Sequence, residues 1–381
     1  MNFDFDTETE AFRQHLRSFA QTHLAPHYLA DGRAGEFHAG LREELAQLGL
    51  FGLLIPEELG GQGASKTVSG VVCEEIARAD FNAGWLITNA LLVSDIINTH
   101  GTDEQRKRWL PAIAAGEQIP AIGLTEPGHG TDAGALEMKA ERDGDGWRLT
   151  GEKTSISLGM HSDVALVFAR TGGPGAKGIS GFYVPLTAKE VSRAPFRDIG
   201  GRPIGRAAIH FDGLYVPQED MLGEEGKGFT SVMQGFDYSR ALIALLCIGA
   251  GQASIDEALE YATQRHAFGQ PIGKFQGVAF PLVEYATHLR AARLLSYEVL
   301  WRVDNGMPHT MEGAMVKWWV PRLAVDAAHE ALLTFGQLGY SEEFPHSQRM
   351  RDMMGMEIGD GTAQVSKIVV ARQLLGREFA P

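Results

Sequence analysis

The sequence predicts an α+β protein in which a middle β-domain of roughly 100 residues separates two helical regions. Apolar residues recur at helical spacing from Thr7 to about Ala115, short alternating or β-branched runs follow Pro120, and long helical repeats return after Gly228. We therefore expect an N-terminal helical domain at residues 1–119, a β-domain at 120–227 and a C-terminal helical bundle at 228–381.

The N-terminal region contains several amphipathic stretches, among them "ETEAFRQHLRSFAQTHL", "FHAGLREELAQLGLFGLL" and "NAGWLITNALLVSDIINTH". Gly101 is typical of a helix end, and Thr102 before Asp103 and Glu104 is typical of a helix start. These signals predict two consecutive helices that meet at Gly101.

The middle region is rich in β-branched and aromatic residues, in runs such as "WRLTGEKTSIS", "DVALVFART" and "RAAIHFDGLYVP". Strands do not alternate with helices, so a doubly wound nucleotide-binding fold is not expected. A formal GxGxxG match at residues 173–178 leads into the strand pattern "ISGFYVPL". Because a dinucleotide site needs a helix at that point, we interpret the match as a hairpin loop.

The C-terminal region predicts three long amphipathic helices and a short helix after Thr362, which together form a bundle. The longest strongly apolar run, Ala241 to Ala250, is about half the length that spans a membrane. The N-terminus lacks the basic and apolar parts of a secretory signal. We therefore expect a cytoplasmic protein with no membrane partner.

Composition narrows the classes of function. A net charge of −14 argues against a nucleic-acid partner, which requires clustered Lys and Arg. The two cysteines, Cys73 and Cys247, lie in apolar helical patterns and predict no disulfide. The 13 histidines are scattered without ligand spacing, and no P-loop, HExxH or CxxC motif is present. No metal site is expected.

Two glycine-rich stretches carry polar groups suited to chemistry. In "IGDGTAQ", residues 358–364, Asp360 lies between two glycines, a pattern that by itself favours a turn. In "AIGLTEPGHGTDAGALEMKAERDGDGWRLTGEKTSISLG", residues 121–159, hydroxyls, carboxylates and backbone amides are concentrated where the β-domain begins. Such a loop suits a large polar ligand, although a plain surface loop has the same composition.

Several motifs in order resemble the acyl-CoA dehydrogenase family across essentially the whole chain. They include "LTEPGHGTD" with "GEKTSIS", "QRHAFGQPIGKFQ" at 264–276, "FGQLGY" at 335–340, "MRD" at 350–352 and "GTAQ" at 361–364. The resemblance implies a helical, β-barrel-like, helical architecture, a homotetramer, one FAD per subunit and an acyl-CoA substrate. It also implies an electron-transfer flavoprotein as the electron acceptor.

The resemblance assigns site residues one by one. Leu124, Thr125 and Ser157 would contact the isoalloxazine ring, and Arg265, Phe268 and Gln276 of a neighbouring subunit would hold the adenosine diphosphate part of FAD, with backbone of the Gly336 loop and with Thr362 and Gln364. The substrate would contact Thr131 on the CoA side, and Tyr238, Ser239, Arg240 and Gly361 around the acyl group. Asn89 and Asp95 are polar exceptions on the apolar helix expected to floor the pocket.

The same resemblance places Asp360 where most of the family has a catalytic glutamate. The implied reaction removes the α-proton of an acyl-CoA thioester while the β-hydrogen leaves as hydride to flavin N5. By the same resemblance, the thioester oxygen would accept hydrogen bonds from the backbone N–H of Asp360 and from a ribityl hydroxyl of FAD. Asp360 is then a base carried on a turn.

Four positions depart from the family pattern. Ser155 replaces an expected tryptophan, Leu333 a glutamine and Lys367 an arginine, while Ser239 holds a site that some members fill with an alternative glutamate. With Ser155, stacking against the flavin would be lost or supplied by another residue. Leu333 puts one contact on the adenine side of FAD in doubt, and Lys367 lies seven positions after Asp360.

Aspartate reaches roughly 1.3 Å less far than glutamate, and a displacement of that size costs about a hundredfold in rate unless something compensates. We expect an α-branched or alicyclic acyl group to fill the space, and "GEKTSIS" resembles members that act on cyclohexane-1-carbonyl-CoA. Two alternatives remain: a nitroalkane-oxidase-like flavoprotein, which also uses an aspartate base, and a flavin-binding member without catalysis.

Overall fold

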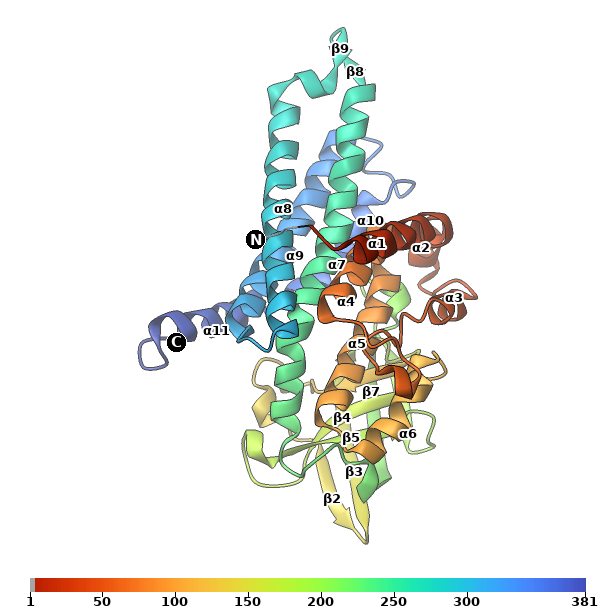
Figure 1. Cartoon of the computed structure of the whole chain (residues 1–381), viewed down its shortest axis with the longest axis vertical. Helices are drawn as coiled ribbons and strands as arrows, with labels where there is room; N and C mark the ends of the chain where they lie inside the picture. The colour runs from red at the N-terminus through yellow and green to blue at the C-terminus, as the bar shows by residue number, and fades with distance from the viewer. Residues whose placement is uncertain (1–3) are drawn as a thin grey trace.

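The computed structural model describes residues 4–381 as two groups of helices and one β-domain (Figure 1). The first helical group contains α1 (Thr7–Phe19), α2 (Ala25–Ala34), α3 (Leu41–Gln47), α4 (Lys66–Ala79), α5 (Phe81–His100) and α6 (Asp103–Ala114). The α-helix-rich, β-rich, α-helix-rich order confirms the predicted fold class.

Local signals in the N-terminal region agree with the structure at one boundary and differ at another. Thr102 caps α6, accepting a hydrogen bond from the Gln105 N–H while the Gln105 side chain accepts from the Thr102 N–H, a capping box that fixes the start of α6. The predicted long helix over "FHAGLREELAQLGLFGLL" is wrong in length. Gly49 has a φ of 69°, a left-handed conformation in which a helix cannot continue, so α3 ends at Gln47.

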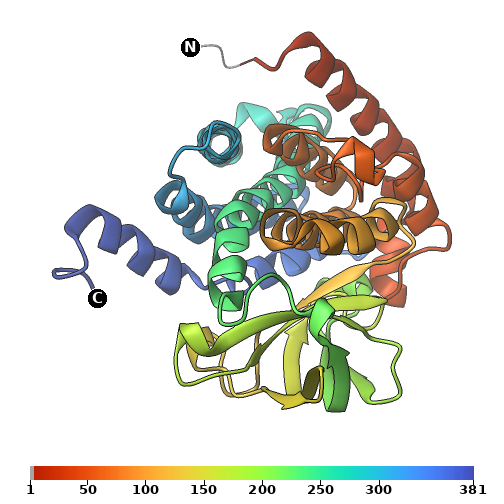
Figure 2. The same ribbon diagram turned by 60° about the horizontal axis from the view of Figure 1, so that its bottom comes forward.

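The β-domain is a seven-stranded sheet, in which the strand order is β1-β4-β2-β3-β7-β6 and β5 pairs with β4. The strands are β1 (Pro120–Gly123), β2 (Lys139–Asp143), β3 (Gly146–Ile156), β4 (Val164–Arg170), β5 (Ile179–Pro185), β6 (Val191–Pro195) and β7 (Ala207–Pro217). Residues 173–178 join the antiparallel strands β4 and β5, as expected for a hairpin loop. Figure 2 shows the sheet as a layer beneath the helices.

The C-terminal group contains α7 (Gly228–Gln264), α8 (Gln276–Asp304), α9 (Thr310–Phe335), α10 (His346–Met354) and α11 (Ala363–Leu375), with a small hairpin of β8 (His266–Ala267) and β9 (Gln270–Pro271) between α7 and α8. The helix α7 is long and apolar enough to cross a membrane, but most of it is buried inside the protein. It is the central core helix: a Cβ at Gly249 would lie 2.2 Å from the Glu74 carbonyl oxygen, so glycine lets α4 cross α7 closely.

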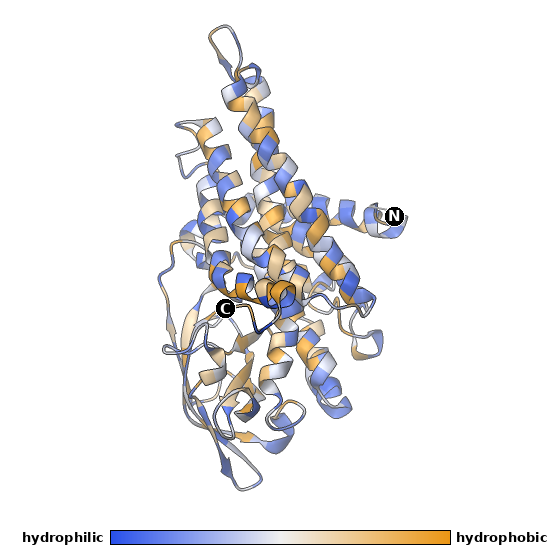
Figure 3. Ribbon diagram, turned by 90° about the vertical axis from the view of Figure 1, so that its left-hand side faces the viewer, coloured by the Kyte–Doolittle hydropathy of each residue, from blue (hydrophilic) through white to orange (hydrophobic). Residues whose placement is uncertain are grey.

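Exposed apolar side chains gather on the outer helices of the C-terminal group. Figure 3 shows hydrophobic segments along the long helices and beside the C-terminus, and α11 extends away from the body of the molecule in Figure 2. The large exposed residues on α8 and α11 are Phe280, Val283, Leu294, Trp301, Leu374 and Leu375. An apolar surface of this kind is typical of a protein–protein contact.

Candidate active site

Asp360 lies in the turn that precedes α11. Its φ is 52° and that of Gly361 is 97°, so two successive residues adopt left-handed conformations just before Thr362, which caps α11. Aspartate tolerates this conformation better than most residues, and glycine adopts it freely. The local interpretation as a turn is confirmed, and the turn presents the Asp360 carboxylate towards α7.

Among the described residues, the side chain that hydrogen-bonds that carboxylate belongs to α7. The Ser239 hydroxyl donates a hydrogen bond to Asp360 Oδ2 at 3.1 Å. Ser239 is buried, and Asp360 is half-buried. The structure therefore brings together the residue expected to be the base and the position where some family members have the alternative carboxylate.

Lys317 holds the backbone of the same turn from α9. Its Nζ donates to the carbonyl oxygens of Met356 at 2.7 Å and Gly361 at 2.8 Å, on the two sides of Asp360. The side chain is 1% exposed. No sequence motif indicated this residue. Its only signal was a lysine inside the apolar stretch "GAMVKWWVP".

The electrostatic environment makes Asp360 a stronger base than a carboxylate in water. Burial raises the pKa of Asp360, and Lys317, the Ser239 hydrogen bond and Arg240 oppose that shift without cancelling it. Burial also lowers the pKa of Lys317 to about 8, against the attraction of Asp360. A carboxyl group with a raised pKa, close to a cation that it does not pair with directly, is typical of acid–base sites.

Arg240 is fixed beside this group by its own helix. Its Nη1 donates to Asp237 Oδ1 at 2.6 Å, and Asp237 Oδ2 accepts from the Thr310 hydroxyl at 2.7 Å. The Arg240 Nε is buried and has no hydrogen-bond partner within residues 4–381. A buried N–H without a partner is costly, so this donor is available to a ligand.

The polar residues expected near the acyl pocket are mostly satisfied by one another. The Tyr238 hydroxyl lies 2.6 Å from Ser69 Oγ, and Lys66 Nζ lies 4.4 Å from the centre of the Tyr238 ring. Lys66 also forms an ion pair with Asp95. Asn89 donates to the Pro120 carbonyl oxygen, which joins α5 to β1. Asp95 is thus neutralised by Lys66.

The predicted flavin-side residues lie where β1 and β3 end. Ser157 follows β3 between Ser155, φ 57°, and Leu158, φ 60°, next to an irregularity in the β3–β7 pairing. Leu124 is buried and Thr125 half-buried. The hydroxyls of Thr125 and Ser157 make no hydrogen bond within the described part of the chain, so both can bind a ligand.

A buried ion pair fixes the loop that contains these residues. The Glu126 carboxylate accepts from Lys153 Nζ at 2.7 Å and from the backbone amides of Glu137 and Met138 at 2.6 and 2.9 Å. Burial alone would raise the pKa of Glu126, but Lys153 and the two amides hold it below its ordinary value. Glu126 is therefore a structural residue of the loop, a role that the motif did not reveal.

The remaining residues expected to bind FAD form a second group. Within a single chain this group does not lie at the β-domain. Figure 1 shows the β8–β9 hairpin at one end of the molecule and the β-domain at the other. Phe268 in this hairpin is 96% exposed, and Arg265 and Gln276 flank it, also exposed. The Arg265 side chain has no hydrogen bond or ion pair within residues 4–381. Gly336 and Gln364 are exposed, as is Thr131 on the β-domain, and Thr362 is half-buried.

Comparisons with known proteins agree over the whole chain. Family models described as acyl-CoA dehydrogenase N-terminal, middle and C-terminal domains match residues 6–117, 121–214 and 226–375. A mitochondrial short-chain specific acyl-CoA dehydrogenase of Rattus norvegicus is 34% identical over 370 residues, covering 96% of this chain and 90% of that protein. A 3-(aryl)acrylate reductase of Clostridium sporogenes is 36% identical over 378 residues, covering 97% and 99%.

Among solved structures, butyryl-CoA dehydrogenase from Megasphaera elsdenii has a TM-score of 0.95 and 31% sequence identity, with 98% of this chain and 100% of that chain covered. The similarity thus extends to all three domains and to their arrangement. The chain belongs to the acyl-CoA dehydrogenase family.

Proposed function

We propose that this protein is an FAD-dependent acyl-CoA dehydrogenase that desaturates the α,β bond of a compact acyl-CoA, with Asp360 as the base. The observation that supports this most directly is the half-buried Asp360 carboxylate, which has a raised pKa and contacts Ser239 at 3.1 Å. Family membership supplies the class of reaction, and the site residues supply its assignment to this carboxylate.

The residues present fit FAD. The free hydroxyls of Thr125 and Ser157 and the side chain of Leu124 would hold the isoalloxazine ring at the β-domain. Arg265 has the guanidinium fork that suits a pyrophosphate, and it has no protein partner within residues 4–381. When bound, FAD supplies the acceptor for the β-hydride.

The protein's own part of the reaction is proton removal and stabilisation of the charge that develops. Asp360 takes the α-proton, and its surroundings disfavour its own charge before the reaction. The backbone N–H of Asp360 donates to no acceptor within residues 4–381, so it is free to donate to the thioester oxygen, where negative charge grows. Lys317 fixes the carbonyl of Gly361 and so the direction of this turn.

The short reach of aspartate favours a substrate with a bulky α-carbon. A branched or alicyclic acyl group, such as cyclohexane-1-carbonyl, brings the substituted α-carbon into the space that a longer glutamate would occupy. The similarity to a short-chain dehydrogenase and to an arylacrylate reductase supports a compact or ring-bearing acyl group.

Anaerobic flavin bleaching tests this proposal. Butyryl-, octanoyl-, isobutyryl- and cyclohexanecarbonyl-CoA are each added to the holoenzyme, and the loss of flavin absorbance is followed by stopped flow. We expect reduction to be fastest with cyclohexanecarbonyl- or isobutyryl-CoA. Preference for butyryl-CoA would contradict the substrate class only, whereas no bleaching with any thioester would contradict the dehydrogenase reaction.

We further infer a homotetramer that completes each FAD site. The exposed Phe268 and the unpaired Arg265 lie far from the β-domain of their own chain, and the exposed apolar residues of α8 and α11 provide a surface for association. An electron-transfer flavoprotein is the proposed acceptor. Its reduction by the substrate-loaded enzyme is directly measurable.

A nitroalkane-oxidase-like reaction is a second candidate, because the base is an aspartate. It predicts oxygen consumption with nitroethane and no need for CoA. The two candidates are separated by assaying the same FAD-loaded protein with nitroethane under air and with the acyl-CoA panel under nitrogen.

A further inference from the structure

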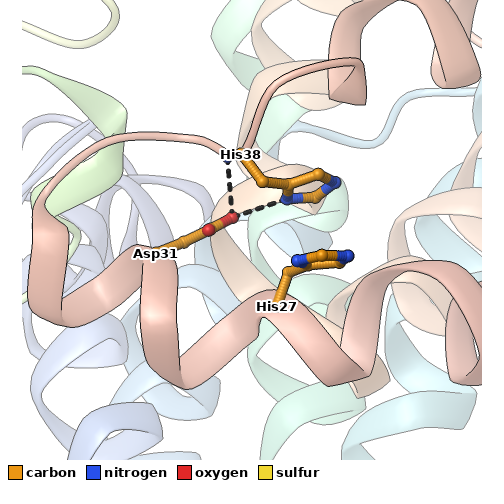
Figure 4. Close-up of side chains that lie close together, drawn as sticks. All are labelled: His27, Asp31 and His38. Carbon is orange, nitrogen blue, oxygen red and sulfur yellow. Dashed lines mark hydrogen bonds and ion pairs between the residues drawn. The ribbon is translucent and has the colours of Figure 1, made fainter.

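Two histidines and a buried carboxylate come together on α2 and the loop that follows it, away from the elements that carry the candidate active site. His27 and Asp31 lie four residues apart on one face of α2, and His38 follows in the loop before α3 (Figure 4). In Figure 4 the His27 ring and the Asp31 carboxylate both point towards the His38 ring. The sequence predicted no metal site, because the loop that returns His38 to α2 is a tertiary feature.

The three side chains lie near the spacing of metal ligands. His38 Nδ1 lies 2.7 Å from Asp31 Oδ2, and the two imidazole rings are stacked with centres 4.0 Å apart. One ligand atom from each of the three residues lies within 4.8 Å of the other two. Ligand atoms around a tetrahedral zinc are about 3.3–3.6 Å apart, given bonds of about 2.0–2.2 Å. His27 is exposed and makes no hydrogen bond within residues 4–381, so it can tilt to close this difference.

The charge balance at this place favours a cation. Asp31 is 6% exposed, and His38 is its one ion-pairing partner among the described residues. A further buried carboxylate, that of Asp80, lies close by. Burial raises the pKa of Asp80 to about 7, and the charges of Asp352 and Asp31 contribute to that shift. A buried carboxylate is costly unless it is paired, and a bound divalent ion would add to the pairing that His38 supplies.

The His38 ring is already fixed for coordination. Asp31 Oδ2 accepts hydrogen bonds from both the backbone N–H and Nδ1 of His38, and no other polar contact holds the ring in the described part of the chain. The Nε2 of His38 is buried and has no partner. A metal at Nδ1 would replace the proton that now lies between His38 and Asp31.

We propose that His27, Asp31 and His38 bind a divalent transition metal of the zinc class, with water as the fourth ligand. Imidazole nitrogens with one carboxylate oxygen are a donor set that zinc accepts. The ion joins the loop at residues 35–40 to α2 and stabilises the N-terminal domain. The site is independent of the proposed dehydrogenase reaction and takes no part in it.

The test is calorimetric titration of the EDTA-treated, FAD-loaded holoenzyme with Zn²⁺, beside His27→Ala and the control His15→Ala. His15 is an exposed histidine on α1, outside the cluster. We expect one zinc to bind per subunit. The affinity for zinc should fall roughly tenfold or more after His27→Ala and stay unchanged after His15→Ala. Zinc should raise the Tm of the unaltered protein and of His15→Ala, and raise that of His27→Ala less at the same zinc concentration.

Two results would overturn the site. The first is that zinc does not bind saturably to the unaltered protein. The second is that His27→Ala binds zinc as tightly as the unaltered protein, which would indicate an adventitious surface ion only. Because His27 is exposed, its substitution should leave FAD content and acyl-CoA-dependent bleaching as they are, which separates loss of the metal from misfolding. Asp31→Asn provides a second variant, since it removes the charge but keeps the shape.

Discussion

Ser239 on α7 donates a hydrogen bond to the carboxylate of Asp360 at 3.1 Å, across 121 residues of sequence. This contact sets the base against the central helix of the protein. It also places a small hydroxyl where a second carboxylate would repel Asp360. Asp360 is therefore the one carboxylate at this contact.

Asp360→Asn should abolish the proton transfer. We expect substrate-dependent flavin reduction to fall by about 10²–10⁴-fold while FAD stays bound, because the amide cannot accept the proton. Stopped-flow bleaching with the preferred acyl-CoA measures the loss. Asp212→Asn, at an exposed position of β7, is the matched control, and its flavin should be reduced by the substrate at the normal rate.

Misfolding would give the same loss, and stability distinguishes the two. Since burial raises the pKa of Asp360, the folded state is disfavoured above that pKa, and the disadvantage disappears as the pH falls from it towards the unfolded value of 3.8. Asp360→Asn should therefore raise stability at neutral pH by about 0.5–2 kcal/mol, with no gain in acid. A lower Tm at pH 7 would count against the buried-base assignment.

Ser239→Ala should move the pH profile. The hydroxyl stabilises the Asp360 carboxylate, so its removal raises the pKa of the base further. The acidic limb of the reduction rate should shift to higher pH, with a loss of roughly two- to tenfold on that limb and little change on the plateau. Ser239→Thr keeps the hydroxyl and should retain the original limb. An unshifted profile in the alanine variant would show that this contact does not act on the base.

Lys317→Met should loosen the turn that carries Asp360. It leaves the carbonyls of Met356 and Gly361 without their donor, at a cost of about 1–3 kcal/mol for each buried group. Hydrogen exchange of residues 355–362 should speed up, and flavin reduction should fall together with it. Lys367→Met is the control, because Lys367 is exposed and lies over the Trp318 ring. Equal hydrogen-exchange rates in the two variants would show that Lys317 does not hold this turn.

Glu126→Gln should destabilise the β-domain loop. The buried Lys153 loses its carboxylate partner, which typically costs about 3–5 kcal/mol. Because the folded pKa of Glu126 is lowered, its contribution is present above the unfolded pKa near 4.5 and is lost as the pH falls through the folded value. The Tm difference between variant and parent should therefore shrink below pH 4.5. Thermal unfolding of the holoenzyme from pH 3 to 8 measures this, and a constant difference would contradict it.

Arg265→Ala tests the second half of the proposed cofactor site. Removing a guanidinium that pairs with pyrophosphate should weaken FAD retention by roughly 10-fold or more, since such charge-assisted bonds are worth about 1.5–3 kcal/mol. FAD content after gel filtration reports the loss. Arg290→Ala, at an exposed position on α8, should keep its FAD. Full retention in Arg265→Ala would remove this residue from the site.

The order of helical and β-rich regions could be predicted because it depends on short-range periodicity and on caps such as Thr102. The sequence did not indicate α10, which has nine residues and few apolar positions. This helix is stabilised by contacts with distant segments, such as the hydrogen bond that the Tyr28 hydroxyl donates to Asp352. It also overestimated α3, where left-handed Gly49 ends the helical run.

The residues of the candidate site also fall into those that the sequence indicated and those that only the structure brought together. The sequence alone determined that Asp360 lies on a glycine turn and, through the family motifs, that it is the candidate base. Only the tertiary structure decided that Ser239 holds it, that Lys317 fixes its turn, that Glu126 is paired with Lys153, and that His27, Asp31 and His38 meet. The physical reason is that charge, burial and hydrogen bonding act between residues that are close in space, and no local pattern in a chain encodes those distances.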